Sequence, residues 1–250
     1  MSTPARYAIS ASIIAAGWWL SGRVRHLAAY VDTNPARLGF EMMGIEILLI
    51  ALAVGVAFAL PGSPARRLGL MPSRLPFGAV IALTIATLGI SHAIDAALAL
   101  WSAPALESSN ATGISRGLAT AGRSPQHRDF AIALFGTVFA PAIGEELLCR
   151  GLIQRGLVRW MHPAIAIAIA AFLFGWLHQE IVHGVIAAGI GLYLGLAAYW
   201  SDSTRPAIAG HALNNFAALL GSIGIAIFPF PAATVSAPSA SEKTKTADAD

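Results

Sequence analysis

The sequence predicts an all-α fold, a polytopic transmembrane bundle of about six or seven spans with a polar cavity among its C-terminal helices. Three observations support this class. Of the 250 residues, 56% are hydrophobic and 12% are charged, and soluble domains carry about twice that charged fraction. The apolar residues form long runs separated by short polar connections. Several of these runs contain ionisable side chains, which hydrocarbon rarely retains unless they meet one another.

The N-terminal part, residues 1–128, is expected to hold the first membrane helices and a polar connection. Residues 7–20 are apolar but short for a span, so we expect them to cross the membrane or to lie at its interface. Residues 40–60 and 77–101 are long enough to span, and a Pro-Gly-Ser-Pro sequence ends the first of them. Residues 102–128 are rich in Ser, Gly and Arg and are expected outside the hydrocarbon.

The C-terminal part is predicted to be a helical core, residues 129–228, followed by a tail. Apolar helices are predicted in this core at residues 130–148, 164–178, 184–200 and 207–228. Residues 229–250 shift to Ala, Ser, Thr, Pro and scattered charges, so they bury little apolar surface and are expected to be disordered.

The formal net charge of +3 comes mostly from arginines in the connecting segments. Basic residues beside spans are typical of topology signals and of contacts with anionic lipids. No basic patch with interleaved aromatic residues argues for nucleic acid, so the lipid bilayer is the expected partner. Arginine numbers on the two sides are comparable and do not decide the orientation. Cys149 is the only cysteine and is expected to be an apolar filler.

The first polar cluster is Glu145-Glu146 with Arg150 four residues after the second acid. Side chains four apart on a helix are neighbours, so Glu146 and Arg150 can form an ion pair that makes their burial tolerable. Glu145 projects about 100° further round the helix and is left to face something else. A carboxylate in an apolar cavity is a stronger general base near neutral pH, so Glu145 is the candidate base.

Two further helices repeat the spacing of four. Phe174 precedes His178 on one helix, and His211 precedes Asn215 on another. A water held between Glu145 and a histidine would be activated towards a carbonyl, and the Asn215 amide and His211 could stabilise the oxyanion. Alternatively, two histidines and a carboxylate could hold a zinc ion, through Glu145, His178 and His211. The histidines lack the His-Glu-x-x-His spacing of common zinc proteases, which makes this alternative weaker.

In their order and separation, Glu145-Glu146-x-x-x-Arg150, Phe174-x-x-x-His178 and His211-x-x-x-Asn215 resemble the three motifs of the CAAX-protease and bacteriocin-processing (Abi) family. The resemblance covers roughly residues 130–220, and the family includes the Ras-converting CAAX endopeptidase. It implies a membrane-embedded endopeptidase that needs no cofactor. It also implies site roles, with Glu145 as the base, His178 assisting it, His211 and Asn215 stabilising the oxyanion, and Glu146, Arg150 and Phe174 as structural support.

Other interpretations remain open at this point. The chain could be a non-catalytic membrane scaffold or immunity protein of the same family, or a proton-coupled transporter. The substrate could be a prenylated CAAX protein, a leader peptide or a segment of a membrane protein. A bacterial plasma membrane is the expected location. The remaining polar residues of the apolar segments, Glu46, His92 and Asp95, are expected to serve packing, and His183 is expected in a loop.

Overall fold

A computed structural model describes residues 35–106, 127–178 and 181–222, and within these ranges it contains helices and no strand. The predicted helix at residues 7–20 and the predicted tail lie outside the described residues. The elements, in chain order, are α2 (Pro35–Ala59), α3 (Pro64–Arg67), α4 (Phe77–Leu106), α6 (His127–Leu134), η1 (Phe135–Phe139), α7 (Ala140–Glu146), η2 (Leu147–Gln154), α8 (Arg155–Leu157), α9 (Pro163–Leu177), α10 (Ile181–Ser201) and α11 (Arg205–Ser222). The predicted all-α class is confirmed.

Four of the described helical segments are long and apolar enough to cross a membrane: Gly39–Ala59, Phe77–Leu98, Phe130–Leu157 and Ile181–Ser201. The apolar α9 has 15 residues, which at about 1.5 Å per residue is shorter than a hydrocarbon core of about 30 Å. The last predicted span, residues 207–228, is described only as far as Ser222, and its described helix, α11, is not among the four. It carries an arginine, a histidine and two asparagines, and these lower its mean hydropathy.

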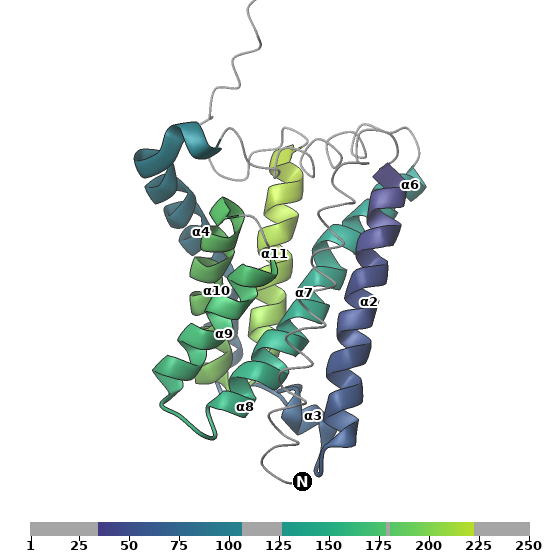
Figure 1. Cartoon of the computed structure of the whole chain (residues 1–250), viewed down its shortest axis with the longest axis vertical. Coiled ribbons are helices and arrows are strands. Elements are labelled where there is room, and N and C mark those ends of the chain that lie inside the picture. The colour runs from purple at the N-terminus through teal and green to yellow at the C-terminus, as the bar shows by residue number, and fades with distance from the viewer. Residues whose placement is uncertain (1–34, 107–126, 179–180, 223–250) are drawn as a thin grey trace, which may run out of the picture.

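The helices form a single bundle (Figure 1). The segment from α6 to α8 runs along α2, and α9 and α10 form an antiparallel pair on the other side. Between them stands α11, which packs against α4, α7 and α10. The three predicted motifs lie on α7 and η2, at the end of α9, and on α11. They therefore come from elements that pack around the middle of the bundle.

Glycines allow α2 to approach the neighbouring helix closely. A Cβ atom at Gly136 would collide with the backbone of Gly39, and one at Gly39 would collide with Ile132. Small residues at crossings let two membrane helices meet backbone to backbone, where dispersion forces hold them. Further along the same crossing, Gly144 lies against the side chain of Glu46. This contact brings α2 to the position immediately before Glu145.

The helix that carries Glu145 contains π-helical turns on both sides of α7, η1 before it and η2 after it. Pro141 explains the first of these. Proline has no backbone N–H and its ring crowds the carbonyl four residues earlier, so the helix locally widens. The carbonyl of Thr137 thereby lacks the amide donor that residue 141 would otherwise supply. Its oxygen instead accepts a hydrogen bond from Nδ2 of Asn215 at 3.3 Å, which ties α11 to this helix.

Candidate active site

A buried ion pair forms the base of the site. Nη1 of Arg150 donates to Oε1 of Glu146 at 2.7 Å, and neither side chain is exposed. Nη2 of the same guanidinium donates to the backbone carbonyl of Gly191 on α10 at 3.0 Å. A buried ion pair is tolerable when further hydrogen bonds satisfy its remaining donors. The predicted pairing of Glu146 with Arg150 is present, and it also joins η2 to α10.

Glu146 also contacts the histidine of α11. Nδ1 of His211 lies 3.0 Å from Oε1 of Glu146, the oxygen that accepts from Arg150. An ionised carboxylate can only accept, so the proton of this bond lies on Nδ1. The bond fixes the orientation of the imidazole and leaves Nε2 to face other groups. Sequence spacing did not indicate this contact, because the two residues are 65 positions apart.

Phe174 lies where the three motifs meet. The guanidinium of Arg150 sits over its ring, 4.3 Å from the centroid. The rings of His178 and His211 approach it edge-on, with centroid distances of 5.1 and 5.7 Å. A cation over the face of an aromatic ring is attracted by its quadrupole. Phe174 was predicted to be packing beneath His178, and it in fact contacts a charged or polar residue from each of the other two motifs.

His178 follows the last residue of α9 and lies outside the four candidate spans. Its Nδ1 lies 2.9 Å from the carbonyl oxygen of Phe174, and since a carbonyl only accepts, Nδ1 carries the proton. Desolvation of the ring lowers the pKa of His178 to about 4, and the charges of His211 and Arg150 act in the same direction. The imidazole is therefore neutral near pH 7, with the lone pair of Nε2 available as an acceptor.

Glu145, like Glu146, has one side-chain oxygen that the described residues leave unsatisfied. Within the described part of the chain, its Oε2 is buried and has no hydrogen-bond partner. The side chain lies within electrostatic range of His211, Arg150 and His183. A buried carboxylate oxygen without a donor is costly, so such an atom in a native fold points to a water or a ligand that supplies one.

The described contacts do not join all the predicted catalytic residues directly. His178 and His211 both contact Phe174, and Glu145 lies within electrostatic range of His211. Asn215 is on the same helix as His211, and its Nδ2 donates to the Thr137 carbonyl. Glu146, Arg150 and Phe174 form the structural frame. The catalytic roles of Glu145, His178, His211 and Asn215 remain predictions.

Two residues near this cluster were assigned other roles from the sequence. His183 was expected in a loop, but it lies on α10 with its ring centroid 4.6 Å from that of His178. Glu46 was expected to serve packing, but it is 2% exposed on α2 and lies within electrostatic range of Glu145. The signal for Glu46 was present in the sequence, since it is an acid inside an apolar span without a cation four residues away.

The metal alternative does not fit the arrangement of side chains. Among residues 35–106, 127–178 and 181–222, no group of three or more His, Cys, Asp or Glu side chains is placed to hold an ion. Glu145, His178 and His211 are thus not converged as zinc ligands would be. Two of the ring nitrogens, the Nδ1 atoms of both histidines, are also engaged with Phe174 and Glu146.

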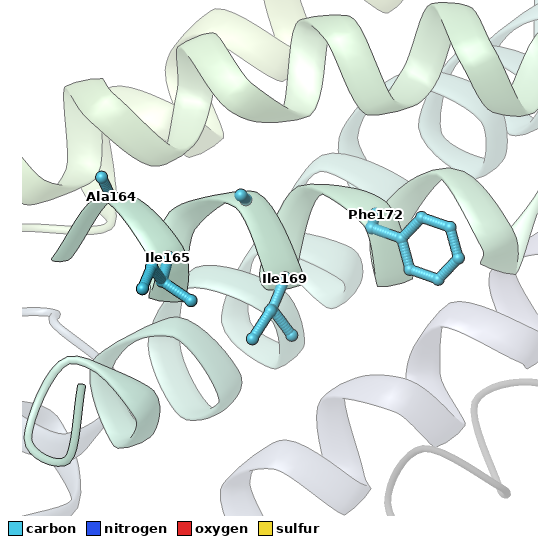
Figure 2. Close-up of a pocket in the computed structure, with 5 residues that line it drawn as sticks. Ala164, Ile165, Ile169 and Phe172 are labelled. Atoms are coloured by element: carbon cyan, nitrogen blue, oxygen red, sulfur yellow. The ribbon is translucent and has the colours of Figure 1, made fainter. Parts of the chain in front are cut away.

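A hollow on the outer side of α9 is separate from this cluster (Figure 2). It is lined only by apolar side chains, those of Ala164, Ile165, Ala168, Ile169 and Phe172. Ile165 and Phe172 are largely exposed. A surface of this composition on an apolar helix suits contact with lipid chains and offers no acid or base.

The fold and the buried polar cluster define the class: an integral membrane protein whose apolar helices surround acid and imidazole groups. Residues 127–217 match the model of the Rce1-like family, described as type II CAAX prenyl endopeptidase Rce1-like. The match contains all three motifs, so the predicted resemblance to this family is confirmed for that segment. Neither the curated proteins nor the solved structures gave a match.

Proposed function

We propose that this protein is an intramembrane endopeptidase in which Glu145 activates a water molecule to hydrolyse a peptide bond of a membrane-associated substrate. The Rce1-like family is a protease family, which supports membrane proteolysis in general. The observation that carries the specific proposal is the buried Oε2 of Glu145, which has no hydrogen-bond partner in the described residues. Glu145 lies within electrostatic range of His211, whose Nδ1 is already fixed by Glu146.

The proposed reaction begins with the water. Glu145 takes a proton from it as the water oxygen forms a bond to the carbonyl carbon of the substrate. His178, neutral and with Nε2 as an acceptor, receives the second hydrogen of the water as a hydrogen bond and so orients it. The carbonyl oxygen becomes an oxyanion. Glu145 then passes its proton to the amide nitrogen, the C–N bond breaks, and a carboxylic acid and an amine leave.

In this proposal, two residues of α11, His211 and Asn215, stabilise the oxyanion. The Nδ1 proton of His211 is directed at Glu146, so this ring can donate from Nε2 only as an imidazolium. The same oxygen of Glu146 also accepts from Arg150. Asn215 donates to the Thr137 carbonyl through one N–H, and its second N–H is available in principle for the oxyanion. Preorganised donors of this kind are each worth about 10²–10³ in kcat.

We further propose that the substrate is prenylated and CAAX-like, and that the enzyme acts in a bacterial plasma membrane. The family match supports this class of substrate over a leader peptide. A membrane-anchored substrate would reach the site laterally, which suits a cluster carried by apolar helices.

The test uses the full chain in lipid nanodiscs with a farnesylated CAAX peptide, and mass spectrometry detects the released tripeptide. We expect cleavage by the wild type, and a fall of about 10²–10⁴ in kcat for Glu145→Gln. Glu41→Gln removes a carboxylate from α2 and serves as the matched control, with activity retained. Circular dichroism and gel filtration establish that each variant is folded. Wild-type-like cleavage by folded Glu145→Gln contradicts the assignment of the base.

A further inference from the structure

Glu46 is a buried acid that has no role in the reaction proposed above. It lies near the middle of α2 and is 2% exposed. Its side-chain oxygen Oε2 packs against Gly144, where a Cβ atom would collide with it. In the described part of the chain, this oxygen has no hydrogen-bond partner. An ionisable side chain in a membrane helix is costly, so its retention indicates a function and a nearby partner.

The groups that face Glu46 identify this partner. From α7, Glu145 lies within electrostatic range, and from η2 the thiol of Cys149 does. α6 and η1 also pack on α2, and their titratable residues, His127, Arg128 and Asp129, stand at the start of α6, before the contact of Ile132 with Gly39. The arginines of α3 follow the end of α2 at Ala59, which is about 20 Å along the helix axis from Glu46 at a rise of about 1.5 Å per residue. The charged group within electrostatic range of Glu46 is another acid, Glu145.

Glu145 is surrounded by groups of both signs. Its electrostatic neighbours besides Glu46 are Glu146, Arg150, His183 and His211. Arg150 forms its ion pair with Glu146 and is thereby largely compensated. The carboxyl groups of residues 46, 145 and 146 thus outnumber the single guanidinium in this cluster.

Two neighbouring carboxylates that share one apolar site do not both ionise readily, and the pair then keeps a proton between them. Resting on the proposed function, we propose that Glu46 is the second carboxyl group of this active site. It stores a proton beside Glu145, so that the two side chains together carry one negative charge. Both have a buried Oε2 atom that needs a donor, and a water molecule between them would satisfy both.

The proton balance of the reaction then involves the pair. At rest the two carboxyl groups hold one proton. As the water attacks, its proton is added and the pair becomes neutral. One proton then passes to the leaving nitrogen as the C–N bond breaks, and the pair returns to a single negative charge. Glu46 is thus a positioning residue that keeps the charge of the site constant through a turnover, while Glu145 remains the group that takes the proton from water.

Infrared spectroscopy of the full chain in nanodiscs tests the stored proton without requiring activity. At neutral pH, we expect the carbonyl stretch of a protonated carboxylic acid in the wild type and its loss in Glu46→Gln, so that it appears as a positive band in the wild-type minus Glu46→Gln difference spectrum. Glu46→Leu, which suits the apolar surroundings, serves if the amide variant does not fold. Glu41→Gln on the same helix leaves the band in place. A Glu46 that shows only the carboxylate band at neutral pH overturns the proposal.

Kinetics provide the second readout. In the wild type, loss of the stored proton at high pH adds a negative charge beside the developing oxyanion and produces an alkaline limb in the kcat profile. Glu46→Gln cannot lose this proton, so we expect that limb to disappear while KM is unchanged. Glu46→Leu lowers kcat by about tenfold or more. An unchanged alkaline limb in folded Glu46→Gln overturns the inference. If the wild type does not cleave any peptide, the proposed function fails, and the infrared result alone decides the role of Glu46.

Discussion

A single carboxylate oxygen, Oε1 of Glu146, lies 2.7 Å from Nη1 of Arg150 and 3.0 Å from Nδ1 of His211. It therefore joins a cation four residues further along its own helix to an imidazole of α11. This relationship gives Glu146 two tasks, one in stability and one in orienting the site. The two tasks can be separated by substitution.

Arg150→Met should lower the stability of the protein, because it leaves Glu146 as a buried carboxylate without its cation. The expected loss is about 3–5 kcal/mol in the free energy of unfolding. The double variant Arg150→Met with Glu146→Leu should recover much of this stability, since no charge is then left unpaired. Thermal unfolding in detergent measures both changes.

Cleavage should respond differently from stability. The double variant removes the oxygen that holds Nδ1 of His211, so activity should stay low even where the fold is restored. Arg150→Lys is the conservative comparison, and it cannot reproduce both hydrogen bonds and the stacking on Phe174. Full activity in the stable double variant would show that Glu146 does not orient His211.

His178 should make the stability depend on pH. Desolvation lowers the pKa of its imidazole from the ordinary 6.5 to about 4 in the folded state. The unfolded chain therefore binds a proton first as the pH falls, and the stability present above pH 6.5 decreases progressively towards pH 4. His178→Gln should flatten this part of the curve of unfolding midpoint against pH. The prediction fails if the two curves remain parallel between those pH values.

Substitution of two glycines of α10, Gly191 and Gly195, should affect different properties: activity for the first and stability for the second. A Cβ at Gly191 would lie 3.1 Å from both Arg150 Nη2 and Phe174 Cδ1, so Gly191→Ala should displace the frame of the site and lower kcat. A Cβ at Gly195 would lie 2.7 Å from Oε1 of Gln154, so Gly195→Ala should lower the unfolding midpoint more than the activity.

The matched control for both is Gly55→Ala on α2, where a Cβ meets nothing within 4 Å. This variant should leave activity unchanged and add about 0.5–1 kcal/mol of stability, as alanine is the better helix former. Parallel losses of kcat and stability in the two α10 variants would remove the distinction between them.

Chelators should leave cleavage intact, because every group in the proposed reaction is a carboxyl, imidazole or amide side chain. The assay is release of the tripeptide before and after prolonged dialysis against 1,10-phenanthroline. Loss of activity on dialysis, followed by recovery when zinc is added back, would contradict the water-activation scheme and favour the metal alternative.

The sequence predicted what depends on local spacing and on composition. The helical class, the Glu146–Arg150 pair and the proximity of Phe174 to His178 all follow from apolar runs or from a spacing of four residues. The contact of His211 with Glu146 does not, because it spans 65 positions and depends on how α11 packs.

The remaining differences have similar causes. His183 joins the site because α10 begins at Ile181, earlier than the apolar run suggested. Asn215 is directed at Thr137 because Pro141 removes a helical donor, which is a consequence of the backbone of the neighbouring helix. Glu46 could have been suspected as an intramembrane acid, but its partner could be found only from the packing of α2 on α7.

The central claim is that Glu145 and His178 act on the same water, and a double-mutant cycle on kcat/KM tests it most directly. Glu145→Asp and His178→Asn each retain a polar group but misplace it, and each should lower kcat/KM for the farnesylated peptide. Substitutions at residues that act as a unit have strongly non-additive effects, so we expect the double variant to be no worse than the poorer single variant. Losses that multiply in the folded double variant would contradict it, because the two side chains would then act independently.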